Sequence, residues 1–354
     1  MTPFQLKPDS VYVVGVGAQT PVGRKSLSAA AAVRCGISAY AEHPFMIDRH
    51  GEPMIVAMAD WLDEAFTAKE RIAQLGIDAA TEAVTPLQAT SHTDLTVLLA
   101  LSSDNLPDER EQINVAERVM SSLEEKGLRT QYHLTVDGNA AGIEVLGLAR
   151  QIIRDNPDTV CLVGGLDSHL GPERLETIDY SGRLHSVNNS WGFTPGEAAG
   201  FNLLASGCVV ERLRLSPLAE VRAVATGKEE KLLGTKTVCI GEGLSAAFRG
   251  ALNGEELISH SYCDLNGETY RADEFGFAVC RTSQYFQDAG SFTAAAECWG
   301  DVGTASGPLQ VALATSAWAR GYAKGRVAFC WSSSAHGPRR GAVRLRQCLE
   351  STTR

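Results

Sequence analysis

The sequence predicts an α/β fold. Short apolar runs with the composition of buried strands alternate along the chain with longer segments in which apolar residues recur at helical spacing. The runs Val11 to Gly17 and Thr159 to Val163 both lead into glycines, which permit the turn that ends a strand. The 354 residues suffice for two ordinary domains or for one large duplicated one.

The first part of the chain predicts buried strands at 11–17, 95–101 and 159–163, and helices from about Lys25 through 29–33, at 109–126 and at 142–154. The segment 109–126 carries one apolar stripe, whereas 142–154 is apolar on most sides. A helix that is apolar all round requires cover all round, so we expect 142–154 to be buried. Two antiparallel strands, 201–205 and 208–211, are expected to meet at Ser206 and Gly207.

After Leu213 the pattern restarts, with strands expected at 218–226, 259–265, 327–331 and 341–346 and helices at 243–252 and 307–321. The same order of elements in 1–212 and in 213–354 predicts two halves that arose by duplication. The segments 168–195 and 266–302 are long and irregular. Loops of that length usually form a site or an interface.

Composition excludes some classes of partner. The net charge of −10 disfavours binding to a phosphate backbone, so we expect no nucleic acid. No run approaches the ~20 apolar residues of a membrane span. The segment from Met1 to Pro8 lacks the apolar core of a signal peptide. We therefore expect a cytoplasmic protein that makes no membrane contact.

The cysteines favour free thiols over disulfides or zinc. Their number is odd, no Cys-x-x-Cys pair occurs, and most stand in apolar runs. Buried free thiols in a reducing cytoplasm explain this pattern. They stand at positions 35, 161, 208, 239, 263, 280, 298, 330 and 348.

Four motifs, in order and spanning nearly the whole chain, resemble those of β-ketoacyl synthases of the thiolase superfamily. They are Val13 to Gly23 (family G-x-G-x-x-T-P-x-G), Cys161 to Asp167 (A-G-G-x-[DE]), Trp191 to Gly200 (G-F-x-P-G-E-G-A-G) and Gly300 to Gly307 (G-H-x-x-G-A-A-G). The resemblance implies a five-layered α-β-α-β-α architecture from two duplicated halves. It does not by itself imply activity, because function lies in the site and not in the scaffold.

The resemblance also locates the catalytic positions. The family uses a cysteine thiolate at a helix N-terminus, which accepts the acyl chain, and two histidines that stabilise developing charge. With Gly142 and Gly147 as anchors, the nucleophile position falls on Asn139. The first histidine position falls on Asn266 and the second on Asp301.

All three catalytic groups are therefore changed together. An asparagine amide is a poor acyl acceptor, and a carboxylate at Asp301 would repel the negative charge that a histidine attracts. The family's lysine falls near Ala296 or Glu297, and its closing glycine-rich loop is replaced by residues 334–340. The chain is also shorter than typical family members, which indicates trimmed loops around the cleft. We expect no condensing activity.

Some alternatives stay open. A nucleophile could have migrated to Cys263 or Cys298, although a satisfied core thiol is more common. Arg339 and Arg340 are weak candidates to grip the phosphate of a phosphopantetheine or coenzyme A ligand. His336 could be a remnant of a pocket, but a position in a solvated loop is the favoured interpretation.

We expect neither a metal nor a dinucleotide cofactor. Gly15-Val16-Gly17 lacks the third glycine of a dinucleotide-binding loop, because Thr20 stands at the expected step. Several polar residues could cluster in the fold, but their spacing matches no cation-binding motif. These are Asp137, Asn139, Asn266, Glu268 and Asp301.

The family dimerises by pairing an edge strand with its copy. We expect that strand near Thr159 to Val163 or at its neighbour, and thus a homodimer or a heterodimer with a related chain. The favoured function is a catalytically inactive interaction scaffold. It would serve beside an active ketosynthase in polyketide or fatty-acid assembly, or as an adaptor in a bacterial effector or secretion cluster. The alternatives are an acyl-thioester enzyme with altered residues and a module that binds acyl-CoA or an acyl carrier.

Overall fold

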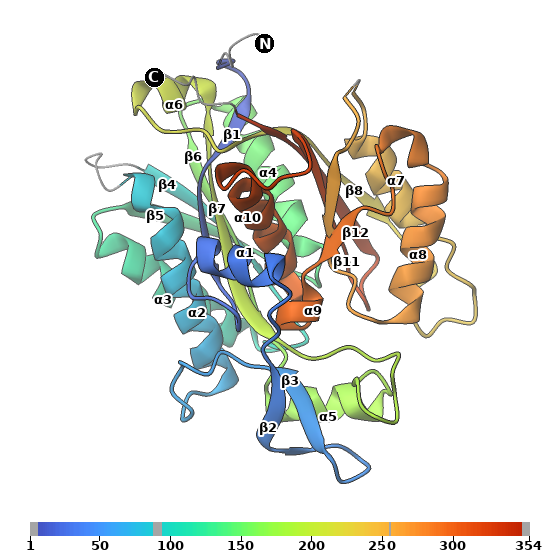
Figure 1. The fold of residues 1–354 in the computed structure, drawn as a ribbon. Helices are drawn as coiled ribbons and strands as arrows, with labels where there is room; N and C mark the ends of the chain where they lie inside the picture. Colours follow the sequence, from blue (N-terminus) through green and yellow to red (C-terminus); the bar gives the residue numbers. More distant parts are fainter. Residues whose placement is uncertain (1–5, 88–93, 255, 349–354) are drawn as a thin grey trace.

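The computed structural model describes residues 6–87, 94–254 and 256–348 (Figure 1). Its main sheet has ten strands in the order β10-β9-β11-β12-β8-β1-β7-β6-β4-β5. The sheet divides into two sets of five, which are joined only where β1 pairs with β8 at Tyr12–Glu220 and Val13–Ala219. We call these the first and the second strand set.

The first strand set has the order β5-β4-β6-β7-β1. β4 pairs in parallel with β5 and β6, whereas β7 pairs antiparallel with both β6 and β1. The strands are β1 (Val11–Gln19), β4 (Asp94–Leu101), β5 (Arg129–Val136), β6 (Val160–Ser168) and β7 (Glu197–Ser206).

The second strand set repeats this arrangement as β10-β9-β11-β12-β8. β9 pairs in parallel with β10 and β11, and β12 pairs antiparallel with β11 and β8. The strands are β8 (Ala219–Lys228), β9 (His260–Cys263), β10 (Phe292–Ala294), β11 (Val327–Ser333) and β12 (Arg339–Gln347). Strand order and direction therefore match between the two sets, as a fold built from two similar halves requires.

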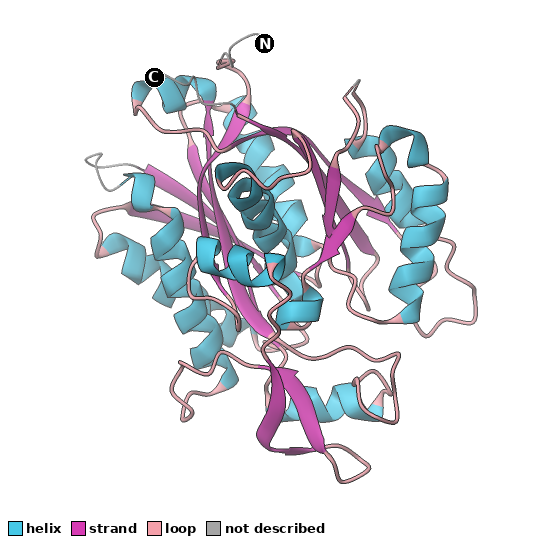
Figure 2. Ribbon diagram, viewed as in Figure 1, coloured by secondary structure: helices cyan, strands magenta, loops and turns pink. Residues whose placement is uncertain are grey.

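Helices complete five layers, α-β-α-β-α (Figures 1 and 2). α2 (Ala68–Ala83) and α3 (Glu109–Glu124) cover the outer face of the first strand set, and α7 (Glu242–Ala251) and α8 (Thr269–Cys280) lie outside the second. α4 (Ala141–Asp155) and α10 (Ser306–Ala319) form the middle layer and contact both sets. α1 (Ser26–Arg34) packs on α10.

The prediction that 142–154 is buried on all sides was wrong in part. α4 buries one face, but it exposes Leu148, Gln151 and Arg154 on the other. α10 is buried along almost its whole length, because its sequence is apolar on every side and a strand set lies on each side of it. Gly142 lets α4 approach α10 closely. A Cβ at this position would lie 2.5 Å from the Thr304 carbonyl oxygen and 2.6 Å from Pro308 Cδ.

A small separate unit projects from these layers (Figure 2). The hairpin of β2 (Tyr40–Ile47) and β3 (Pro53–Ala57) packs with α5 (Pro172–Tyr180) around its own apolar core. That core includes Met54, Val56 and Leu175. Three single turns of 3-10 helix, at Thr85–Leu87, Ser283–Tyr285 and Gly303–Ala305, complete the described elements.

Three sequence-based expectations were wrong. The predicted strand 208–211 is a helix, α6 (Gly207–Arg212), because the Ser206 hydroxyl caps its N-terminus by accepting from the Val209 N–H. The irregular segment 168–195 contains α5, and 266–302 contains α8, β10 and α9 (Ala296–Trp299). Finally, β6 is not an edge strand, since β4 and β7 flank it; β5 is the edge of the first strand set.

In the part of the chain that the structure describes, no helix combines the length and the apolar character needed to cross a membrane.

Candidate functional site

A polar cavity of about 260 Å³ opens at the N-terminus of the buried helix α4. The end of β5, the end of β6 and the loop after β11 form its walls. Charged and amide side chains from distant segments converge on it: Asp104, Asp137, Asn139, Asp167, His169, Arg174, Arg183, Arg271, Asp301 and His336. We call it the α4 cavity.

The three positions singled out from the sequence lie together: Asn139 and Asp301 line this cavity, and Asn266 contacts Asp301. The Asn139 amide nitrogen lies 3.0 Å from Asp301 Oδ1 and donates to it. The Asn266 amide nitrogen donates to Asp301 Oδ2 over 2.7 Å. Both carboxylate oxygens of Asp301 therefore accept from an asparagine.

Asp301 is held as a carboxylate. Burial by itself would raise the pKa of this group. The hydrogen bond from His169 and the charge of Arg271 outweigh burial, so the pKa of Asp301 lies well below its ordinary range. His169 Nε2 and an Arg271 nitrogen are each 3.5 Å from a carboxylate oxygen, and the Gly303 N–H donates over 2.9 Å.

Two buried arginines connect the cavity to its surroundings. Arg271 pairs with Asp264 at 2.7 Å, and Arg183 grips Glu268 with two nitrogens at 2.6 and 2.9 Å. Burial raises the pKa of Asp264 to about 6, against the opposing charge of Arg271. Arg183 also lies 2.6 Å from His336 Nε2, so this histidine belongs to the mouth of the cavity and is not simply part of a solvated loop.

Asp167 also lines the cavity and links β6 to the loop that carries Asp301. Its carboxylate accepts from the Thr304 N–H over 3.0 Å and from the side chain of Asn105, which also lies 3.1 Å from His169 Nδ1. Burial raises the pKa of Asp167. Gly303 has φ of +51°, and a Cβ there would lie 1.8 Å from Asp167 Oδ2. Only glycine fits this position.

The cavity offers no thiol. No cysteine stands among the described residues that line it. At the N-terminus of α4, where a cysteine would be activated, the structure has the Asn139 amide, whose nitrogen is bonded to Asp301. The arrangement neutralises and buries a carboxylate, and the hydroxyl groups available among the described lining residues are those of Ser102 and Ser103.

The two cysteines considered as migrated nucleophiles are core thiols. Cys263 in β9 is 3% exposed and donates to the Thr293 carbonyl oxygen over 3.7 Å. Cys298 in α9 is 5% exposed. Burial raises the pKa of both thiols, so both stay protonated near neutral pH. Neither environment favours a thiolate.

The anion site predicted at Arg339 and Arg340 finds no support in the geometry. The Arg340 side chain is 1% exposed, pairs with Glu274 at 2.6 Å, and donates to the carbonyl oxygens of Ser334 and Gly337. Arg339 pairs with Asp137 at 2.6 Å and with Glu144. Both guanidinium groups are thus already engaged by this chain's own acceptors.

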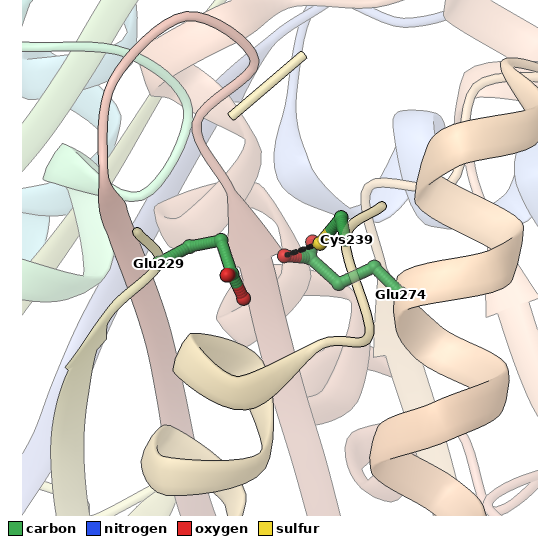
Figure 3. A group of neighbouring side chains, drawn as sticks. All are labelled: Glu229, Cys239 and Glu274. Atoms are coloured by element: carbon green, nitrogen blue, oxygen red, sulfur yellow. Dashed lines mark hydrogen bonds between the residues drawn. The ribbon is translucent and has the colours of Figure 1, made fainter. Parts of the chain in front are cut away.

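Glu274 also belongs to a group whose ligand atoms lie within 4.8 Å of one another, with Glu229 and Cys239 (Figure 3). The two carboxylates of this group already have partners within the chain. The Glu229 carboxylate accepts from the N–H groups of Gly243 and Lys231, and Arg340 compensates Glu274. Burial raises the pKa of the Cys239 thiol to about 11. These contacts account for the group without a cation.

Sequence reasoning missed His169, Arg183 and Arg271 as members of the site. His169 follows the Gly-Gly-x-Asp motif by two residues, and Arg183 stands in the segment 168–195 that was expected to form a site. Arg271 stands in α8, inside the other segment that was expected to be irregular. The unusual length of the two segments was the feature of the sequence that could have pointed to Arg183 and Arg271.

No family model and no curated protein matches this sequence. Solved structures do match its fold. One match is a chain of "AntDE:AntF", described as a type II PKS acyl-carrier protein in complex with its ketosynthase bound to the hexaketide. Its TM-score is 0.77 at 14% sequence identity, and the match covers 96% of this chain and 100% of the other. The ishigamide ketosynthase/chain length factor gives 0.76 at 16% identity, covering 96% and 99%.

A third match is the ketosynthase ApeO in complex with its chain length factor ApeC from Xenorhabdus doucetiae. It has a TM-score of 0.74 and 14% identity, and the match covers 96% of this chain and 98% of the other. The protein therefore has the thiolase-like ketosynthase fold, as the sequence motifs implied. At these identities the likeness concerns the fold.

Proposed function

We propose that this chain is a ketosynthase-like protein that does not condense acyl groups and acts as an interaction scaffold or accessory subunit. The observation that carries the proposal is the hydrogen bond between Asn139 and Asp301 at the N-terminus of α4. In this interpretation Asn139, Asn266 and Asp301 occupy the positions of the cysteine and the two histidines of an active enzyme.

The chemistry supports inactivity by that mechanism. Condensation requires a nucleophile that forms a thioester and donors that stabilise an enolate and an oxyanion. Asn139 has no anionic form, and its amide nitrogen donates to Asp301. The Asp301 carboxylate adds negative charge where negative charge would develop. Loss of one group can leave residual catalysis, but here all three groups differ.

The edge strand β5 supports a role in pairing with a protein partner. It bonds to β4 on one side, forms the edge of the sheet, and exposes Arg129, Gln131 and His133. An exposed edge strand readily pairs with another strand. Some of the matched structures are complexes of a ketosynthase with a chain length factor or with an acyl-carrier protein. We propose that β5 pairs with its copy or with a related chain.

We also propose that the two halves, 1–212 and 213–354, are the units of an ancestral duplication. The partner would be a chain of a polyketide or fatty-acid assembly, or of a bacterial effector or secretion cluster. With either kind of partner, the chain would use the β5 edge for pairing and would not turn over a substrate.

One observation favours a second candidate, an acyl-CoA or acyl-carrier binding module. The α4 cavity persists with a volume of about 260 Å³, and Arg183 and His336 lie at its mouth. Such a module would be stabilised against heat by coenzyme A derivatives, by an amount that rises with the logarithm of the ligand concentration once the site is saturated.

The test is a pull-down from the native host with mass spectrometry, followed by reconstitution with the captured chain. We expect a related chain that carries a cysteine at the N-terminus of its own central helix, or a second copy of this chain. The proposal is contradicted if the purified chain remains a monomer and condenses malonyl and acyl thioesters on its own.

A further inference from the structure

A second group of reactive side chains lies at the other end of β9. His260 begins this strand, whereas Asn266 of the α4 cavity follows its end. His260 Nδ1 lies 3.0 Å from Ser291 Oγ, and His260 Nε2 lies 2.8 Å from Thr293 Oγ1. Lys324 Nζ lies 2.8 Å from the same Ser291 oxygen. None of these residues takes part in the α4 cavity.

The lysine occupies one lone pair of the Ser291 hydroxyl. An ammonium group can only donate, so Ser291 Oγ accepts from Lys324, and its own proton can be donated to His260 Nδ1. In the tautomer that accepts this proton, His260 carries its own proton on Nε2 and donates it to Thr293 Oγ1. A hydroxyl bonded to an imidazole, which a third group orients, is the arrangement of an activated nucleophile.

The imidazole is unprotonated at neutral pH, and the same lowered pKa makes it a weaker base than an ordinary histidine. Burial, together with the nearby charge of Lys324, lowers the pKa of His260 to about 4, so the ring is neutral near pH 7. The backbone holds the serine in place, because the Ser291 N–H donates to the Asp288 carbonyl and the Ser291 carbonyl accepts from the Ser261 N–H, each over 3.1 Å. Ser291 is half-buried and not sealed in the core.

A cavity of about 330 Å³ adjoins this group, and His260, Thr293 and Lys324 form part of its wall, whereas Ser291 lies behind the wall in contact with His260 and Lys324. The remaining wall is largely aromatic and aliphatic, with a second cation: Tyr262, Phe292, Tyr322, Leu313 and Arg34. Apolar walls with a few polar groups suit a small organic ligand. The volume and lining fit a short acyl chain.

We propose that Ser291 is the nucleophile of a second site, which accepts short acyl groups from esters or thioesters with His260 as the base. Ser291 Oγ forms a bond to the carbonyl carbon, and its proton moves to His260 Nδ1. The bond from that carbon to the alcohol or thiol then breaks, and the leaving group takes the proton from His260. Water hydrolyses the resulting serine ester by the same steps and regenerates Ser291.

Lys324 has a second role in this scheme. Negative charge develops on the attacked carbonyl oxygen, which forms next to Ser291 Oγ and within reach of the ammonium group. Thr293 acts as a positioning residue, because it contacts the histidine and not the reacting atoms.

The experiment exposes the full chain to p-nitrophenyl butyrate, follows p-nitrophenolate release, and locates the butyryl group by peptide mass spectrometry. We expect the group on the peptide that contains Ser291. Ser291→Ala should abolish that adduct, and His260→Gln should slow its formation at least tenfold. Ser283→Ala is the matched control, because Ser283 is exposed and lies outside the group.

Two further variants distinguish a role of Thr293 in positioning His260 from a purely structural role. Thr293→Val should reduce the rate of acylation with little change in the KM for the ester, and Thr293→Ser should restore the rate. Acylation of Ser291 at an unchanged rate in His260→Gln would overturn the proposal, as would butyrylation of other residues without Ser291. The inference concerns a different cavity, so either result leaves the proposed function of the α4 cavity unaffected.

Discussion

At the scale of single residues, Asp301 organises the α4 cavity. It accepts from Asn139, Asn266 and the Gly303 N–H, and the charge of Arg271 compensates it. A buried carboxylate with these partners is stabilised in its charged form, and the same charge opposes any anion formed nearby. The residue that stands where a family histidine is expected therefore does the opposite of what that histidine does.

A cysteine restored at position 139 should remain poorly reactive. In Asn139→Cys the N-terminus of α4 lowers the thiol pKa, but the Asp301 carboxylate raises it, so we expect a value at or above the ordinary ~8.5. The measurement is the pH dependence of iodoacetamide alkylation, followed on the peptide that contains position 139. Asn139→Cys combined with Asp301→Asn should lower the pKa by at least about one unit. A single variant with a thiol pKa below 7 would contradict this account.

His260 should make stability depend on pH. Its pKa in the folded chain is about 4, lower than the ordinary 6.5, so between these values the unfolded chain binds the extra proton. Stability is therefore complete above about pH 6.5 and falls as the pH drops towards 4, by at most about 3 kcal/mol.

Urea unfolding at several pH values measures this effect. The unfolding free energy of the wild type should fall relative to that of His260→Gln across this window, because glutamine can bond to both hydroxyls but does not titrate. Parallel curves for the two proteins would show that His260 does not titrate at a lowered pKa.

At the scale of elements, β5 is the surface on which pairing depends. Its position at the sheet edge follows from the strand order and could not be obtained from its own sequence. That sequence does alternate, with Gln131 and His133 between Tyr132 and Leu134, which is typical of a strand but does not say where in the sheet the strand lies. The resemblance to the family placed the edge near 159–163 or at its neighbour. The strand there, β6, is instead flanked by β4 and β7, and α2 and α4 cover its two faces, which explains its apolar sequence.

Added negative charge on β5 should disrupt pairing. In the double variant Gln131→Glu with His133→Glu, two copies of the strand would bring like charges together on a chain that already carries a net charge of −10. We expect the dissociation constant of the dimer to rise at least tenfold by sedimentation equilibrium.

The matched control is Gln284→Glu with Gln287→Glu, which adds charge at two exposed positions outside β5. If both double variants associate like the wild type, the interface lies elsewhere.

At the scale of the whole molecule, the fold was accessible from the sequence and much of the site was not. Glycine motifs such as Gly164-Gly165 and Gly303 mark places where the fold leaves no room for a Cβ, against the Phe201 ring, the Thr304 carbonyl and the Asp167 carboxylate respectively. The convergence of Asn139, Asn266 and Asp301 was predicted through the same motifs. Arg183 and Arg271 could not be, because the partner of Arg183, Glu268, is 85 residues away and Arg271 itself stands in an unrecognised helix.

Arg340 shows the converse failure. An Arg-Arg pair in a loop-like sequence suggested an exposed anion site, but β12 begins at Arg339 and turns the Arg340 side chain inward to Glu274. Over so short a segment, strand periodicity alone does not tell which of two adjacent arginines is buried. The carboxylate that pairs with the buried arginine must also be known. The sequence did not reveal that partner, which lies in α8.

The most direct test of the central claim supplies the purified chain with malonyl-CoA and an acyl-CoA, then measures carbon dioxide release and acylation of the peptide that contains residues 137–142. The account predicts no release above the rate of the protein-free solution and no acyl group on that peptide. Steady release of carbon dioxide, together with a 3-ketoacyl product, would contradict it.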